Sequence, residues 1–397
     1  MLTSLALMFL LGMALGWVFQ RLHLPSLLGM LITGIILGPY GLNLLDGSIL
    51  GISADLRQLA LIIILTRAGL SLNLEDLKRV GRPAILMCFV PACFEMAGMV
   101  LLAPRLLGIS TLDAAIMGAV VAAVSPAVIV PRMLRLMEEG YGTAQGIPQL
   151  IMAGASVDDV FVIVMFTSFT GLAQGGTFSP AALAQIPVSI ATGLVAGALI
   201  GVLFALFYQK VHVRDSAKVV VLLSISFLLV ALENGLKGVF PFSGLLAVMS
   251  CGIAVQRRRP ELAGRLSAKY AKLWVAAEVI LFVLVGATVD TGYALAAGPA
   301  ALLLIVLVLL FRVAGVFVCL LKTGLSLSER LFCMIAYCPK ATVQAAIGSL
   351  PLSMGLSCGH IVLTVAVLAI LITAPLGALG VDLTYRKLLS RVPPSEG

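Results

Sequence analysis

Charged residues are scarce in this sequence. Asp, Glu, Lys and Arg together make up 11% of the 397 residues, whereas hydrophobic residues make up 61%. Soluble domains contain about a quarter charged residues, so the composition excludes a soluble globular protein and indicates a polytopic membrane protein. The polar connections between apolar segments are short, so no soluble domain can be separated from the chain. We expect one transmembrane domain over residues 1–397, whose function resides within the bilayer.

Several functional signatures are absent as well. The seven cysteines show no CxxC spacing, which argues against a resident metal site or a disulfide framework. The sequence contains no nucleophile and base constellation and no phosphate-binding loop, so neither an enzyme nor a bound cofactor is expected. The net charge of +8 is spread over many connections rather than gathered in a basic domain. Nucleic acid is therefore not expected as a partner.

Apolar runs bounded by charge, glycine or proline predict thirteen membrane-spanning helices. The first run lacks the basic N-terminal region of a signal peptide and is expected to remain in the protein. If the N-terminus lies outside, twenty basic residues fall in inward-facing connections and three in outward-facing ones, as the positive-inside rule requires. We therefore expect a cell membrane location, an outside N-terminus and a cytoplasmic C-terminus, with anionic lipids as additional partners. The expected spans are residues 2–19, 24–39, 56–71, 84–103, 112–134, 149–171, 185–208, 217–234, 240–255, 272–290, 296–321, 329–350 and 357–381.

Seven ionisable residues fall inside these predicted spans, where each is costly unless it is paired or hydrated. Glu95 and Arg312 lie at matched depths, about 16 and 15 Å from the cytoplasmic ends of their spans. Their opposite charges predict an intramembrane ion pair. The alternative is that each side chain faces a separate aqueous cavity. The full set of candidates is Arg67, Glu95, Asp158, Asp159, Glu278, Arg312 and Lys340.

Two predicted spans contain a proline among small and polar residues, AAVSPAVIVP in the fifth and IAYCPKATVQAAIGSLP in the twelfth. Proline removes a helical hydrogen bond, and irregular backbone at membrane depth persists only beside protein or a water-filled cavity. A simple proline kink would explain either span alone. The two spans are seven apart, however, so they cross the membrane in opposite directions, and such paired interruptions indicate the midplane site of a transporter. The broken-helix candidates are Ser125, Pro126, Pro339, Lys340 and Thr342.

The same offset of seven spans predicts two inverted repeats, at about residues 1–171 and 217–385, joined by a linker helix at about 185–208. No residue-level similarity supports the repeats, so this expectation depends on topology and on the positions of the proline breaks. Within the linker helix, Gly193, Gly197 and Gly201 form a small-xxx-small pattern, which we expect to serve internal packing.

The adjacent carboxylates in GASVDDVFVIV are the main candidates for ligand binding. Asp158 and Asp159 lie about 15 Å into the sixth span, and neighbouring positions on a helix diverge by about 100°. One carboxylate can therefore hold a structural partner while the other meets a ligand, and a proton and a cation such as Na+ would compete for it. Hydroxyls of Ser125, Ser156 or Thr342 and carbonyls of unwound backbone would complete the oxygen ligands. The alternative is a purely structural salt-bridge network.

These motifs resemble those of the cation/proton antiporter superfamily and, within it, the Na+/H+ antiporters of the NHA type. The resemblance is carried by LTRAGLSL, AAVSPAVIVPRML, GYGTAQGIPQLIMAGASVDDV and CPKATVQAAIG, and it extends over essentially the whole chain. It implies an all-α membrane fold with crossing broken helices, and exchange of Na+ or Li+ for H+ by alternating access. It also implies that Asp159 carries the cation or proton with Asp158 in support, and that Lys340 compensates the carbonyl ends of the broken helices.

The resemblance further implies a homodimer in which core helices, at about 84–171 and 296–385, move against a dimerisation scaffold formed by the remainder. Electrogenic bacterial members carry a lysine where this chain has Arg312, and an arginine does not lose its proton in proteins. The stoichiometry is therefore left open. The alternative function is a sodium-coupled symporter for an organic solute, although the adjacent aspartates argue against the larger polar pocket that a symporter needs.

Overall fold

The computed structural model of the chain describes residues 1–72, 81–175, 180–236 and 240–391. Within these residues every regular element is a helix, apart from an isolated bridge between Tyr141 and Arg391. The predicted all-α fold class is therefore confirmed. The chain folds as two compact units, and each is described by itself. The first comprises Met1–Ala54, Glu75–Val162 and Leu281–Gly397, and the second comprises Asp55–Leu74 and Ile163–Ile280.

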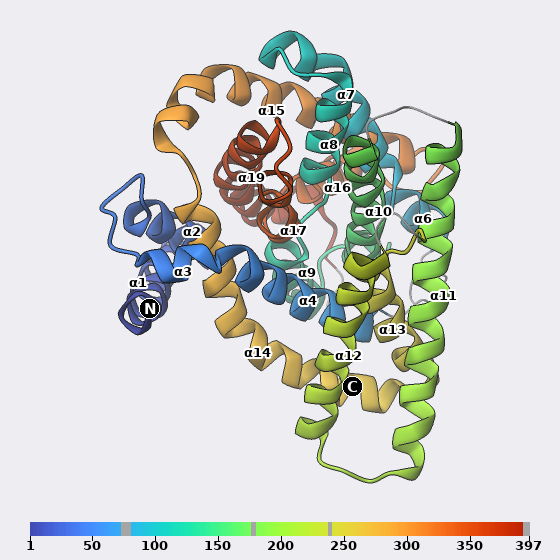
Figure 1. Cartoon of the computed structure of the whole chain (residues 1–397). Coiled ribbons are helices and arrows are strands. Elements are labelled where there is room, and N and C mark those ends of the chain that lie inside the picture. The colour runs from blue at the N-terminus through green and yellow to red at the C-terminus, as the bar shows by residue number, and fades with distance from the viewer. Residues whose placement is uncertain (73–80, 176–179, 237–239, 392–397) are drawn as a thin grey trace. The chain divides into compact units, whose positions relative to one another are not determined.

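The first unit contains the helices and breaks that carry Glu95, Asp158, Asp159, Arg312 and Lys340 (Figure 1), whereas the candidates Arg67 and Glu278 belong to the second unit. Helix α10 (Ile147–Gly175) begins in this unit, and α14 (Pro260–Ala287) ends in it. The other helices are α1 (Leu2–Arg21), α2 (Ser26–Leu37), α3 (Gly47–Gly51), α6 (Arg82–Met87), α7 (Val90–Leu107), α8 (Thr111–Val121), α9 (Pro126–Glu139), α15 (Thr291–Cys319), α16 (Leu327–Ala336), α17 (Thr342–Ile347), α18 (Leu350–Ser353) and α19 (Gly359–Leu388).

The second unit is organised around α4 (Ser53–Ser71), α11 (Pro180–Lys210), α12 (Asp215–Leu236) and α13 (Gly244–Arg258). Helices α11 and α13 lie side by side because three glycines let their backbones approach (Figure 1). A β-carbon at Gly197 would overlap the carbonyl oxygen of Ala247, and Gly193 and Gly201 meet carbonyls of α13 in the same way. The predicted packing role of these glycines is confirmed.

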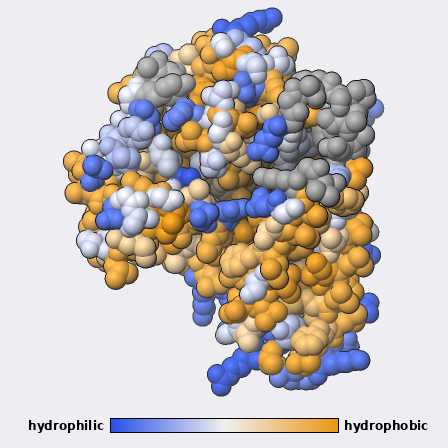
Figure 2. Space-filling model, viewed as in Figure 1, coloured by the Kyte–Doolittle hydropathy of each residue, from blue (hydrophilic) through white to orange (hydrophobic). Residues whose placement is uncertain are grey.

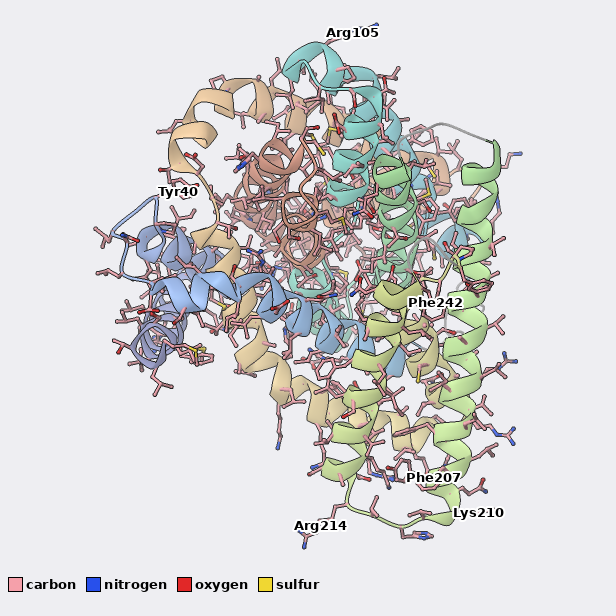
Figure 3. All side chains as sticks on the ribbon, viewed as in Figure 1. Tyr40, Arg105, Phe207, Lys210, Arg214 and Phe242 are labelled. Carbon is pink, nitrogen blue, oxygen red and sulfur yellow. The ribbon has the colours of Figure 1, made fainter. Side chains whose placement is uncertain are left out.

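The outer surface of the long helices in the second unit is apolar. Leu199 and Leu203 on α11 and Leu228 on α12 are exposed, and Figure 2 shows a largely hydrophobic surface over these helices. At the turn that joins α11 to α12, Figure 3 shows Lys210 and Arg214. An apolar surface that ends in basic residues suits a helical hairpin whose turn lies at a membrane interface.

Nine helices within the described residues are long and apolar enough to cross a membrane, so the protein is a multi-pass integral membrane protein. The predicted count of thirteen spans is not confirmed. The four expected spans outside this set are residues 24–39, 56–71, 240–255 and 329–350, which correspond to α2, α4, α13 and the interrupted pair α16 and α17. Helices α2 and α13 have only 12 and 15 residues, and α4 carries three charged residues. The inverted repeats and the division into core and scaffold stay predictions.

Candidate cation-binding site

Two broken helices contact each other inside the first unit. Helix α8 ends at Val121 and α9 begins at Pro126, so residues 122–125 between them are not helical. Helix α16 ends before Tyr337 and α17 begins at Thr342, which leaves residues 337–341 outside both helices. The backbone amide of Ser125 donates a hydrogen bond to the carbonyl of Pro339 at 2.8 Å. The predicted broken helices are confirmed, and their breaks touch.

Proline and close packing account for the breaks. Pro126 stands at the first position of α9, where its missing N–H costs no helical hydrogen bond. Pro339 lies in the second break, and its ring packs so closely on Gly377 of α19 that a β-carbon there would overlap it. The backbone amide of Lys340 donates to Thr373 Oγ1, also on α19, at 2.9 Å. Helix α19 thus satisfies a backbone group that the break leaves without a helical partner.

A methyl group at Gly377 is expected to displace Pro339 and to disturb both breaks. Overpacking of this kind costs about 1–3 kcal/mol, so Gly377→Ala should lower the thermal stability of the purified protein and its transport rate. Gly264→Ala is the matched control, because Gly264 is a helical glycine with open space around it. Alanine is favoured over glycine in a helix, so the control should be at least as stable as the parent. Unchanged stability in Gly377→Ala would show that α19 does not hold Pro339.

Arg312, fully buried on α15, links two acids to the ends of two broken helices. Its Nη1 lies 2.7 Å from Glu95 Oε2, and its Nη2 lies 3.1 Å from Asp158 Oδ2. Its Nε donates to the carbonyl of Tyr337 at 2.6 Å, and Nη1 also donates to the carbonyl of Ala122. The structure therefore brings Glu95 and Arg312 together, and it adds Asp158 to the pair, which matched depth alone does not predict.

Lys340 shares Glu95 with Arg312. Its Nζ lies 2.5 Å from Glu95 Oε2, and both side chains are buried. The family resemblance implies that Lys340 compensates the carbonyl ends of the broken helices. In the structure its ammonium group pairs with Glu95, and it is Arg312 that donates to carbonyls at those ends.

The adjacent aspartates on α10 differ in their contacts. Asp158 is completely buried, and its Oδ2 accepts hydrogen bonds from the backbone amide of Val124 at 2.8 Å and from Arg312. Asp159 is 9% exposed and forms no hydrogen bond or ion pair with any described residue. The Oδ1 atoms of both aspartates and the hydroxyl of Ser125 are buried and have no hydrogen-bond partner among the residues that the structure describes. Protein donors therefore hold the Asp158 carboxylate in place, whereas Asp159 is left without such a donor in the described part of the chain.

The other predicted ligands, Thr342 and Ser156, add little to these oxygen atoms. Thr342 is buried at the start of α17, whereas the side chain of Ser156 lies outside the described part of the chain. Across the ranges that the structure covers, no group of three or more His, Cys, Asp and Glu side chains could hold a metal ion. The site therefore offers two carboxylates and a hydroxyl. Its three buried acids and two buried bases leave one negative charge if all are ionised, which one Na+ or one proton would neutralise.

Two uncharged residues in this region are not singled out by the sequence. The amide Nε2 of Gln344 donates to the carbonyls of Val121 and Ala123 at 3.1 and 2.8 Å, and the hydroxyl of Tyr337 donates to the carbonyl of Met87 at 2.9 Å. Neutral polar residues in an apolar span carry no large burial cost, so they do not stand out as charged residues do. The available signal was their position in the interrupted motif of the twelfth predicted span.

Broken helices that meet beside buried carboxylates are characteristic of secondary transporters. The chain belongs to the sodium/hydrogen exchanger family, whose transmembrane family model matches residues 5–386.

Similar proteins agree with this assignment. Sodium/hydrogen exchanger 9B2 of Mus musculus is 33% identical over 384 residues, which cover 93% of this chain and 69% of the relative. The protein of the same name in Homo sapiens is 34% identical over 391 residues, with coverage of 93% and 70%. The structure of the sodium proton antiporter MjNhaP1 from Methanocaldococcus jannaschii at pH 8 superposes with a TM-score of 0.85 at 21% identity, covering 98% of both chains. This likeness confirms the predicted antiporter fold.

Proposed function

We propose that this protein exchanges Na+ or Li+ for H+ across a membrane by alternating access, with the proton and the cation competing for Asp159. The observation that carries the proposal is the contrast between the two adjacent carboxylates. Asp158 is held by Arg312 and by the backbone amide of Val124, whereas Asp159 has no such partner among the described residues. An unpaired carboxylate in an apolar interior requires a proton or a cation to neutralise it. Membership of the sodium/hydrogen exchanger family supports Na+ and H+ as the transported ions.

The cation would be bound by Asp159 together with Oδ1 of Asp158 and the hydroxyl of Ser125, neither of which has a hydrogen-bond partner in the described ranges. Protonation of Asp159 removes the charge that holds the cation, so one site binds either ion but not both. A loaded site is neutral and can be presented to either side of the membrane, whereas an empty charged site cannot cross easily. Exchange follows from these two properties. Glu95, Arg312 and Lys340 hold the broken helices in position around the site.

The wider arrangement follows the family resemblance. We propose a homodimer in a cell membrane, with an outside N-terminus, in which the core helices at about 84–171 and 296–385 move relative to the remaining helices. No resident cofactor and no enzymatic step are required for this exchange. The alternative of a sodium-coupled organic-solute symporter has no support from the relatives described above, which are exchangers or antiporters.

Purified protein in liposomes that contain a pH-sensitive dye tests the proposal. External Na+ or Li+ should raise the internal pH because protons leave as the cation enters, whereas choline should have no effect. Uptake of an organic solute with Na+, without proton movement, would contradict the proposal and favour the symporter.

A further inference from the structure

The unwound stretch between α8 and α9 is held almost completely by side chains from other helices. Three successive carbonyls are occupied: Gln344 donates to those of Val121 and Ala123, and Arg312 donates to that of Ala122. The next two backbone amides are also bonded, that of Val124 to Asp158 and that of Ser125 to the carbonyl of Pro339. Carbonyl oxygens of unwound backbone are natural ligands for a monovalent cation. Here the last carbonyl of α8, that of Val121, and the first two carbonyls of the break are already committed to protein donors.

Gln344 is held in one orientation by this arrangement. Its side chain is fully buried on α17, and both amide hydrogens are used by the two carbonyls. A flipped amide would place Oε1 against two carbonyl oxygens, so the acceptors define which end is nitrogen. Oε1 itself is buried and accepts no hydrogen bond from any residue that the structure covers, which costs about 1–3 kcal/mol. An apolar residue would fill the same space without that cost, so the hydrogen bonds from Nε2 explain why an amide stands here.

We propose that Gln344 is a positioning residue that sets the cation specificity of the site. By holding the carbonyls of Val121 and Ala123, it withholds them from the transported ion and leaves mainly the oxygens of Asp159, Asp158 and Ser125. Few ligands in a rigid site favour a small cation, because larger cations take more oxygens at longer distances. Gln344 thereby favours Na+ and Li+ over K+. This inference depends on the proposed exchange of cations for protons at Asp159.

The test compares apparent KM values for Na+, Li+ and K+ in liposomes for the parent protein and Gln344→Met. Methionine keeps the length and approximate volume of glutamine but donates no hydrogen bond. The two released carbonyls should then become available to a larger ion, so the ratio of the KM for K+ to that for Na+ should fall about tenfold, the change expected for the net energy of one hydrogen bond. Gln149→Met is the matched control, since Gln149 lies on α10 about 14 Å along the helix from Asp158, and its ratio should match the parent.

Two outcomes separate this inference from the proposed function. A parent protein that moves no protons in response to Na+ overturns both. A parent that exchanges Na+, with a Gln344→Met variant that is equally selective or slower for all three cations alike, overturns the role of Gln344 alone. If Gln344→Met is not recovered in folded form, the same KM ratio is measured for Gln344→Asn. The shorter asparagine side chain cannot reach both carbonyls, so this ratio should also fall, and an unchanged ratio would overturn the role of Gln344.

Discussion

Replacement of Asp159 by asparagine is expected to reduce Na+-driven proton movement to the level of empty liposomes. Asparagine has nearly the same shape but neither releases a proton nor carries the charge that holds a cation. The same substitution should leave the protein at least as stable as the parent in the absence of Na+, because it removes a buried charge that has no partner among the described residues. The dye assay measures the first effect and thermal unfolding of the purified protein measures the second.

Two further aspartate variants provide the controls for that result. Asp113→Asn alters a partly exposed carboxylate at the start of α8, which accepts a hydrogen bond from Ser110 at 2.7 Å, and exchange should persist. Asp158→Asn removes a charged partner of Arg312, so it should lower thermal stability where Asp159→Asn does not. Exchange that survives in Asp159→Asn, or equal stability losses in the two adjacent variants, would contradict the assigned roles.

Substitution of Arg312 by methionine is expected to produce the largest loss of stability of any single change in the site. Methionine retains much of the side-chain length but leaves Glu95 and Asp158 without the guanidinium, and the carbonyls of Tyr337 and Ala122 without their donor. Breaking a buried ion pair by removing one partner costs about 3–5 kcal/mol. Thermal unfolding should therefore occur at a much lower temperature, and little exchange should remain.

Arg132→Met is the matched control for this substitution. Arg132 lies 3.2 Å from Asp382, but the two side chains are 18% and 28% exposed, and partly exposed pairs contribute about 0–1 kcal/mol. The loss of thermal stability in Arg312→Lys should lie between those of Arg132→Met and Arg312→Met. Lysine keeps the positive charge but lacks the planar guanidinium group that donates to several acceptors at once. Equal losses for Arg132→Met and Arg312→Met would show that the buried network does not stabilise the first unit.

The features that could be predicted from the sequence are those with a strong local cause. Pro126 and Pro339 lack a backbone N–H, so each favours an interruption among the small and polar residues around it. Proline alone does not decide the matter, because Pro131 and Pro375 lie inside the continuous helices α9 and α19. A charge in an apolar span is costly in any fold, which is why Glu95, Arg312 and the adjacent aspartates stand out as candidates. Depth along a helix further restricts which charges can meet, and the structure does place Glu95 beside Arg312.

The remaining features depend on the rotational orientation of each helix about its axis, which could not be derived from the sequence. Depth alone does not show that Arg312 also reaches Asp158, or that Lys340 pairs with Glu95. Gln344 carries no charge, and its position in an interrupted motif does not reveal that it donates to the carbonyls of Val121 and Ala123. The predicted count of thirteen spans is not confirmed for a related reason. An apolar run does not define where a helix begins, and the run at 24–39 contains only the 12 residues of α2.

The competition between proton and cation is tested most directly by calorimetric titration of the purified protein with Na+ over a range of pH. If both ions bind Asp159, the apparent Kd for Na+ should rise about tenfold for each unit of falling pH once the site is largely protonated. Titrations in buffers of different ionisation enthalpy should then show that each bound Na+ releases one proton. A Kd that is constant over the pH range in which the protein transports, or Na+ binding without proton release, would contradict the account.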